Sequence, residues 1–200
     1  KMENTPFITI GIPTYNSEKY IRACIDSILN QTYHNIKIIV SDNGSTDNTE
    51  KIVLSYNDPK IKFHKNKKNL FCYGNYNVII DIADGEFLAI YHSDDVYEKT
   101  IVEKQVEFLQ KNPGTMAVFT ESYLINSKGK IIGQINFPEE FLNINILDFK
   151  KAYNGFLKYG DFLICPSAMF VKKVFSIVGN FKEENFFLTT TDEKWKKLLQ

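Results

Sequence analysis

The chain has 200 residues, of which 44% are hydrophobic and 24% are charged, and its formal net charge is zero. This composition is ordinary for a globular domain and argues against a disordered chain. Because no overall basic field exists, we expect no nucleic-acid partner. The three cysteines are widely spaced in apolar surroundings. This pattern favours buried free thiols over disulfides or a zinc site.

Neither a secretory leader nor a membrane-spanning segment is predicted. The first residues are polar, and the apolar run after them is too short for the core of a signal peptide. The longest apolar runs fall well below the roughly 18 residues of a membrane-crossing helix. The chain starts with Lys1 and stops inside a helix-like stretch at residues 193–200, so we interpret it as a fragment. Peripheral membrane association through missing parts stays open.

In chain order, β-favouring apolar runs alternate with segments of helical periodicity. The predicted strands cover residues 7–12, 36–40, 61–64 and 86–91. The predicted helices cover residues 20–29, 46–56, 76–83 and 101–109. Pro13 is expected to close the first strand, and Gly85 to cap the third helix. Four repeats of strand and helix predict βαβ units around a mainly parallel sheet, which is an α/β fold.

The remaining chain is predicted to be less regular. Its predicted elements are a strand pair at residues 116–125 and 131–135, a loosely helical segment at 141–157 and a strand at 166–171. Most aromatic side chains of the helical segment are expected to pack in a core, although the segment is also a candidate wall of a binding groove.

Carboxylates follow two predicted strands at the point where each strand ends. Asp42 follows the second strand, and the adjacent Asp94 and Asp95 follow the fourth. Right-handed crossovers place these strand ends along one edge of the sheet, where open α/β sheets bind their ligands. A divalent metal between the adjacent carboxylates and an anionic ligand would offset their mutual repulsion. The alternative for the pair is a polar loop that caps the next helix.

The glycine pattern excludes two common nucleotide sites. Neither GxGxxG nor GxxxxGK[ST] follows the first predicted strand, where the chain instead reads PTYN at residues 13–16. Rossmann dinucleotide binding and P-loop chemistry are therefore not expected.

Several short motifs occur in one order and spacing. They are PTYN at residues 13–16, SILNQTY at 27–33, IVSDNGSTDNT at 39–49, Asn77, ADGE at 83–86 and SDD at 93–95. Together they resemble glycosyltransferase family 2 over residues 7–97. The resemblance implies a GT-A-like fold with a mainly parallel central sheet flanked by helices. It also implies one catalytic domain across residues 1–200, divided near residue 110 into a nucleotide-sugar-binding half and an acceptor half.

This resemblance further implies transfer of a sugar from a nucleoside-diphosphate donor, most often UDP-linked, with inversion and with Mn²⁺ or Mg²⁺. The acceptor would be a hydroxyl of a glycan or of a lipid-linked molecule. The enzyme would act in the cytoplasm, at the inner face of the membrane, in the assembly of a cell-envelope polysaccharide. Asp95 matches the metal ligand of the family. The residues that match the nucleotide-sugar pocket are Pro13, Thr14, Tyr15, Asp42 and Asp94.

A catalytic base is expected near the end of the chain. Residues 174–181 resemble the family segment that precedes an acidic pair, and the best match to that pair is Asp192 with Glu193. Inversion requires one carboxylate to take the proton of the acceptor hydroxyl, and Asp192 is the candidate, with Glu193 behind it. Thr191 and Asp192 also fit ordinary helix capping, and residues 183–184 offer a third-ranked acidic pair.

Two positions depart from the family pattern. His92 stands where many relatives have a carboxylate, and Tyr76 stands where they have the arginine of an Ala-Arg-Asn motif. Arg22 is the only arginine in the chain, so any further contact to a diphosphate would come from a lysine or a backbone amide. His92 is either a packed, hydrogen-bonded residue or a second group of the metal site.

Two other function classes stay open. The first is a pocket that binds a nucleotide without transferring a sugar, which an assay of donor hydrolysis or transfer would distinguish. The second is a metal-dependent nucleotidyltransferase, which shares the acidic edge but attacks the α-phosphate of a nucleoside triphosphate. Such an enzyme normally needs a glycine-rich and basic loop after the first strand, and PTYN is not such a loop.

Overall fold

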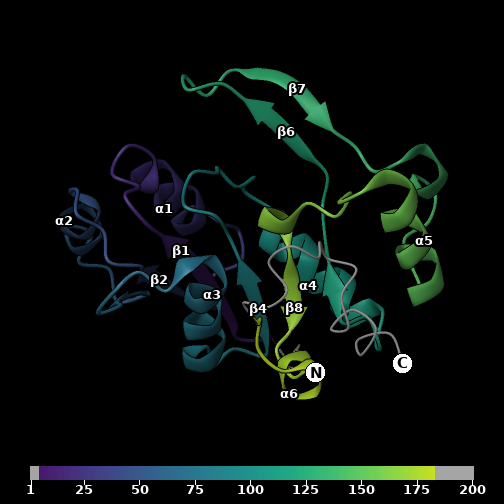
Figure 1. The fold of residues 1–200 in the computed structure, drawn as a ribbon, viewed down its shortest axis with the longest axis horizontal. Helices are drawn as coiled ribbons and strands as arrows, with labels where there is room; N and C mark the ends of the chain where they lie inside the picture. Colours follow the sequence, from purple (N-terminus) through teal and green to yellow (C-terminus); the bar gives the residue numbers. More distant parts are fainter. Residues whose placement is uncertain (1–4, 183–200) are drawn as a thin grey trace.

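The computed structural model describes residues 5–182. Its centre is a six-stranded sheet in the order β3-β2-β1-β4-β8-β5 (Figure 1). Within this sheet only β8 runs antiparallel to its neighbours, so the predicted mainly parallel α/β sheet is confirmed. The strands are β1 (Ile8–Thr14), β2 (Ile36–Asp42), β3 (Ile61–Lys65), β4 (Phe87–Ile90), β5 (Ala117–Val118) and β8 (Met169–Val171).

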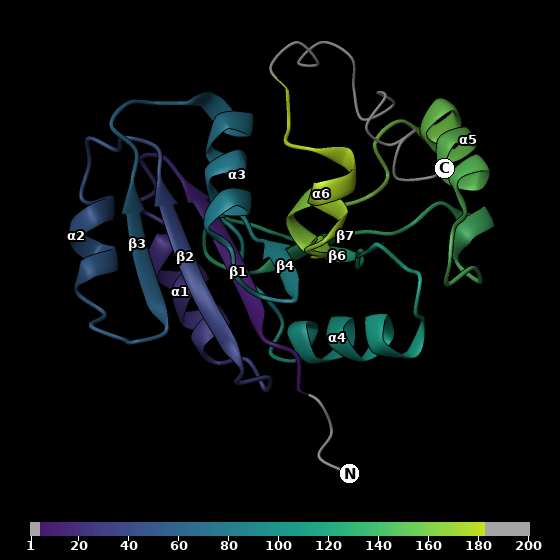
Figure 2. The same ribbon diagram turned by 90° about the horizontal axis from the view of Figure 1, so that it is seen from below.

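Helices cover both faces of the sheet (Figure 2). Apolar residues of α1, α2 and α4 pack on one face, and those of α3 and α6 pack on the other. Phe87 and Ala89 of β4 join the first cluster, whereas Leu88 and Ile90 join the second, as the alternation of side chains along a strand requires. The helices are α1 (Ile21–Leu29), α2 (Thr49–Leu54), α3 (Phe71–Ile82), α4 (Ile101–Lys111), α5 (Phe149–Tyr159) and α6 (Val174–Val178).

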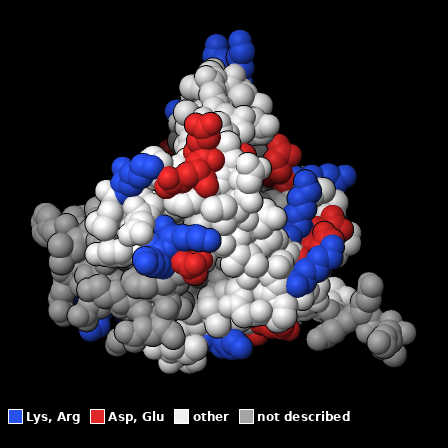
Figure 3. All heavy atoms as spheres, turned by 90° about the vertical axis from the view of Figure 1, so that its right-hand side faces the viewer, with Lys and Arg blue, Asp and Glu red and all other residues white. Residues whose placement is uncertain are grey.

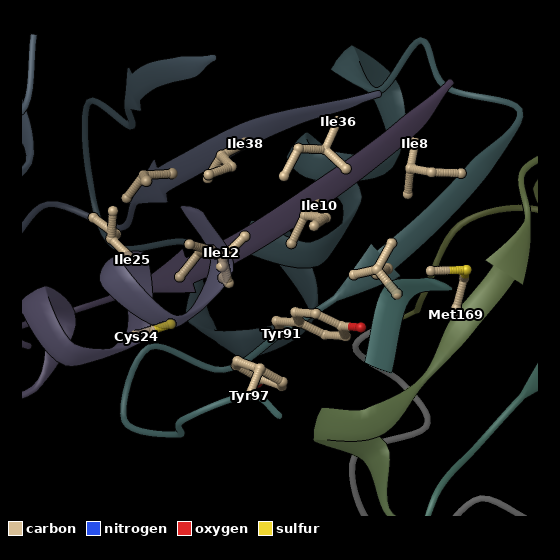
Figure 4. Close-up of a cluster of buried hydrophobic side chains, with 14 of the residues drawn as sticks. Ile8, Ile10, Ile12, Cys24, Ile25, Ile36, Ile38, Tyr91, Tyr97 and Met169 are labelled. Atoms are coloured by element: carbon tan, nitrogen blue, oxygen red, sulfur yellow. The ribbon is translucent and has the colours of Figure 1, made fainter. Parts of the chain in front are cut away.

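The larger cluster lies between β1, β2 and helix α1 (Figure 4). The Tyr91 and Tyr97 rings belong to the same cluster and stack on each other, with centroids 3.9 Å apart. Cys24 is buried there as a free thiol, which confirms the expectation for this cysteine. Cys72 and Cys165 are also free, but both are exposed, so the expectation that they are buried was wrong. Their apolar neighbours in sequence do not cover them, because each lies at an end of an element: the start of α3 and a short 3₁₀ turn.

Strand β1 continues past the predicted stop at Pro13. Pro13 is aligned with Ser41 of β2, and the strand ends one residue later. The carbonyl of Gly11 accepts a hydrogen bond from the backbone N–H of Tyr91, so the backbone polar groups of Gly11 point toward β4. The backbone of Pro13, two residues later, points the same way. The pairing of β1 with β4 has ended at Gly11, so the missing N–H of Pro13 removes no ladder bond.

The expected role of Gly85 as a helix cap was wrong. Helix α3 ends at Ile82, Ala83 caps it in an extended conformation, and Gly85 is not among the glycines with positive φ. A Cβ atom on Gly85 would lie 2.5 Å from the backbone nitrogen of Thr9 and 2.8 Å from the carbonyl oxygen of Phe7. The glycine is needed because β1 approaches this backbone closely.

Gly85→Ala is therefore expected to lower the free energy of unfolding by about 2–3 kcal/mol, because backbone atoms must shift to admit the methyl group. Chemical denaturation measures the change. Gly133→Ala is the matched control, since a Cβ atom there would meet its nearest neighbour, in the Leu124 side chain, at an ordinary 3.4 Å. Equal stability of the two variants would contradict the steric explanation.

The predicted strand at residues 116–125 divides between two sheets. Its first part is β5 at the edge of the central sheet, and its second part is β6 (Ser122–Ile125), which pairs with β7 (Ile131–Ile135) in a separate hairpin. The hairpin projects away from the sheet (Figure 1). The predicted strand at 166–171 begins instead as the 3₁₀ turn Cys165–Ser167.

The helical segment predicted at residues 141–157 is shorter than expected. It consists of the 3₁₀ turn Glu139–Phe141 and helix α5, and Phe141, Phe156 and Phe162 form a small cluster of their own. Lysines and carboxylates are interspersed on the described surface of this side (Figure 3). Among residues 5–182, none of the helices has the length and hydropathy needed to cross a bilayer.

Candidate active site

The site begins where β1 ends. Thr14 is only 3% exposed, and its hydroxyl has no hydrogen-bond partner in the described chain. Its carbonyl accepts a hydrogen bond from the backbone N–H of Asn43 at 2.8 Å, which joins the ends of β1 and β2. Tyr15 follows with 49% of its surface exposed. Since buried hydroxyls are usually paired, Thr14 marks a position that a ligand or water would complete.

Asp42 ends β2 directly beside Thr14, with which it is aligned in the sheet. Asp42 is fully buried. Both carboxylate oxygens lie 3.2 Å from the backbone nitrogen of Ser45, and the Ser45 hydroxyl also donates to Asp42. Gly44 forms the turn between them with φ of +81°. The carboxylate is thereby fixed in orientation.

A network of buried amides holds the segment around Asp42, and the sequence analysis did not find it. The Asn66 amide donates to Asn75 at 2.9 Å, and the Asn75 amide donates to the carbonyl of Ser41 at 2.9 Å. Asn43 donates to Asn69 at 2.9 Å. These bonds fix the ends of β2 and β3 against the start of α3, which begins at Phe71 instead of the predicted residue 76. The signal in the sequence was the density of asparagine between residues 66 and 77.

Two loops from separate strand ends are joined by serines. The Ser17 hydroxyl, in the loop after β1, lies 2.8 Å from the hydroxyl of Ser93, in the loop after β4. The backbone N–H of Ser17 donates to Thr49 Oγ1 at 2.8 Å, and Asp47 accepts from the same threonine. Ser17, which directly follows the PTYN motif, therefore links the NGSTDNT and SDD motifs at the carboxyl edge of the sheet.

The loop after β4 carries a group of potential metal ligands. His92, Asp94 and Asp95 each place one ligand atom within 4.8 Å of the others. Burial, with a smaller contribution from Asp94, raises the pKa of the Asp95 carboxyl to about 6. Burial lowers the pKa of the His92 imidazole, and the nearby Asp94 carboxylate opposes that shift. Two carboxylates and an imidazole are side chains that could hold a divalent metal.

The two interpretations of His92 are not exclusive in this structure. Its Nε2 atom lies 3.0 Å from the hydroxyl of Tyr76, and its backbone N–H donates to Tyr97 at 2.7 Å. His92 is thus packed and hydrogen-bonded, and it is also part of the potential metal site.

Comparison with known proteins identifies the family. The sequence pattern of the family described as Glycosyl transferase family 2 matches residues 9–177. The chain belongs to glycosyltransferase family 2. An uncharacterized glycosyltransferase of Rickettsia felis is 36% identical over 203 residues, a match that covers 98% of this chain and 32% of that protein.

A second family 2 relative has a specific name. The Escherichia coli protein UDP-Glc:alpha-D-GlcNAc-diphosphoundecaprenol beta-1,3-glucosyltransferase WfgD is 33% identical over 151 residues, which cover 76% of this chain and 55% of WfgD. The chain spans 31–59% of the length of the first four curated relatives.

Solved structures show the same fold. Residues 1–349 of Staphylococcus aureus TarS in complex with UDP-GlcNAc align with a TM-score of 0.74 at 21% identity, over 96% of this chain and 53% of that chain. The mannosyltransferase PcManGT of Pyrobaculum calidifontis, in complex with GDP-Man and Mn²⁺, aligns with a TM-score of 0.64 at 20% identity, over 88% and 48% of the two chains. The predicted GT-A-like fold is therefore confirmed.

The site residues expected from the family 2 motifs lie at the ends of three adjacent parallel strands. Thr14 and Asp42 are neighbours in the sheet, and Asp94 and Asp95 form one group with His92. Pro13 is partly buried inside β1, and Tyr15 is half-exposed beside it. Asp192 and Glu193 lie outside the described residues, as does the acidic pair at 183–184.

Proposed function

We propose that this chain is the catalytic domain of an inverting glycosyltransferase that moves a sugar from a UDP-sugar to a hydroxyl of a glycan or lipid-linked acceptor. The observation that carries the proposal is that Thr14 and Asp42 lie side by side at the carboxyl edge of the sheet, one strand away from the group formed by His92, Asp94 and Asp95. A base with an N–H between two carbonyl groups, such as uracil, would donate to Asp42. The half-exposed ring of Tyr15 is available to stack on that base.

A divalent metal fits the group at the end of β4. Asp94 and Asp95 supply the oxygen ligands that Mn²⁺ and Mg²⁺ prefer, with Asp95 as the main ligand. Asp94 is exposed and lies toward the solvent side, where the ribose and diphosphate of a donor would approach. A bound metal would neutralise the charge that grows on the leaving diphosphate.

The acceptor would bind on the side formed by residues 111–200, and Asp192 would take the proton of its hydroxyl, with Glu193 behind it. An attack from the face opposite the leaving diphosphate inverts the anomeric carbon. The name of WfgD describes a diphosphoundecaprenol acceptor, which supports a lipid-linked acceptor here as well. Such an acceptor would place the enzyme at the inner face of the membrane, in assembly of a cell-envelope polysaccharide.

Calorimetric titration with UDP, with and without Mn²⁺, tests the donor site, with GDP and ADP as controls. Selective, Mn²⁺-dependent binding of UDP supports the proposal. Binding of UDP without hydrolysis or transfer of any UDP-sugar would favour a nucleotide-binding domain without catalysis. Absence of binding to all three nucleotides would overturn the proposed donor site.

The raised pKa of Asp95 predicts a pH dependence of metal binding. Below the pKa of about 6, Mn²⁺ must compete with a proton, so the affinity is expected to fall up to about tenfold per pH unit and to level off above about pH 7. Titration with Mn²⁺ alone measures this, because the diphosphate then contributes no protons.

The raised pKa of Asp95 also affects the stability of the metal-free protein. It favours the folded state below about pH 4, and this contribution is lost as the pH rises through 6.

A further inference from the structure

We infer that His92 binds the metal through Nδ1 and that Tyr76 is the positioning residue that holds the imidazole ring by its Nε2 atom. The inference rests on the proposed function, because it concerns the metal of the same site. It assigns a nitrogen ligand to a position where many relatives of the family carry a carboxylate.

The structure fixes both the backbone and the ring of His92. Its N–H donates to the Tyr97 hydroxyl at 2.7 Å, and its carbonyl accepts from the Cys24 thiol at 3.3 Å. The rings of His92 and Tyr76 are nearly parallel, with an interplanar angle of 26° and a centroid distance of 6.1 Å. The Tyr76 hydroxyl lies 3.0 Å from Nε2. The ring is therefore held before any ligand binds.

The contacts of His92 leave one ring nitrogen for a metal ion. When Nε2–H donates to the Tyr76 oxygen, Nδ1 carries a lone pair. Residues 5–182 offer Nδ1 no hydrogen-bond partner, and a ring nitrogen of His92 lies within 4.8 Å of oxygens of both Asp94 and Asp95. Because Tyr76 engages Nε2, the metal is assigned to Nδ1, with the two carboxylates as its other ligands.

The inference has a consequence for metal selectivity. Imidazole nitrogen binds Co²⁺ and Mn²⁺ in preference to Mg²⁺, whereas a site of oxygen ligands alone accepts Mg²⁺ readily. The ratio of Co²⁺ to Mg²⁺ affinity is therefore expected to fall at least about tenfold in His92→Asp, which restores a carboxylate. Tyr76→Phe keeps the ring and removes the oxygen, and we expect it to weaken Mn²⁺ binding about tenfold.

Pulsed electron paramagnetic resonance of the Mn²⁺ and UDP complex tests the ligand directly, with the protein labelled with ¹⁵N in its three histidines. We expect a ¹⁵N coupling in the wild type that His92→Asp abolishes and His34→Asn retains, since His34 is exposed. Calorimetry with Co²⁺ and Mg²⁺ gives the affinity ratios. Tyr73→Phe is the control for Tyr76→Phe, because it removes a hydroxyl from the same helix.

The outcomes separate the two proposals. A Mn²⁺ and UDP complex without ¹⁵N coupling, and with the same metal ratio in His92→Asp, would overturn the role of His92 and leave the donor site standing. Equal Mn²⁺ affinity in Tyr76→Phe and Tyr73→Phe would overturn the positioning role of Tyr76. Absence of Mn²⁺ binding with and without UDP would overturn both the metal site and this inference.

Discussion

Replacement of Asp95 by alanine is expected to abolish Mn²⁺-dependent UDP binding and to slow sugar transfer at least about a hundredfold. Asp95 is the proposed main ligand of a metal that holds the donor diphosphate. Its removal leaves Asp94 and His92, which are too few to keep the ion against water. The fold is expected to persist. Burial raises the pKa of this carboxyl, and its removal takes no hydrogen bond away from a buried side chain among the described residues. Calorimetry and a UDP-sugar transfer assay measure the two effects.

The control for this variant is Asp58→Ala, which removes a carboxylate just before β3, at the opposite edge of the sheet. It should leave both UDP binding and transfer unchanged, although it removes a bond to the backbone N–H of Lys60. Normal metal-stimulated transfer in Asp95→Ala would show that the metal, if used, binds elsewhere.

Replacement of Asp192 by asparagine is expected to leave the affinity for UDP unchanged and to slow transfer about 10²–10⁴-fold. An amide of the same shape cannot accept the proton that the acceptor hydroxyl must lose. The effect should therefore be confined to the rate of transfer, which a radiolabelled UDP-sugar assay measures alongside calorimetry.

Two further variants distinguish the candidate bases. Glu193→Gln is expected to have a smaller effect, and Glu183→Gln is expected to have none. Transfer at the wild-type rate in Asp192→Asn would assign the base to another residue, and a large loss in Glu183→Gln would point to the acidic pair at 183–184.

The four repeats of strand and helix were predictable because their elements are local and repetitive. Runs such as Ile36–Val40 are β-branched almost throughout, which is typical of a strand covered on both faces, and β2 lies where they predicted it. The positions of Asp42 and Asp95 at one edge followed from the rule that parallel strands end together.

The remaining features depend on contacts between distant segments. The pairing of β8 with β4 and β5 is antiparallel and joins residues more than 50 positions apart, which no local pattern encodes. The amide network of Asn43, Asn66 and Asn75 was missed because asparagine in a sequence first suggests a turn. The contact between Tyr76 and His92 was not predictable because it joins helix α3 to the loop after β4, 16 positions further along the chain.

The antiparallel pairing of β5 with β8 makes residues 119–168 an insert whose two ends lie side by side. Val118 of β5 lies opposite Met169 of β8, and the Ser167 hydroxyl accepts from the backbone N–H of Thr120 at 2.9 Å and faces its carbonyl at 3.2 Å. The insert contains the β6–β7 hairpin and α5, whereas the donor residues lie on β1, β2 and β4. Lengthening, shortening or exchanging this insert therefore need not disturb the sheet. The layout therefore offers a graft point between positions 118 and 169, at which a foreign segment could replace residues 119–168 while β1, β2 and β4 stay unchanged.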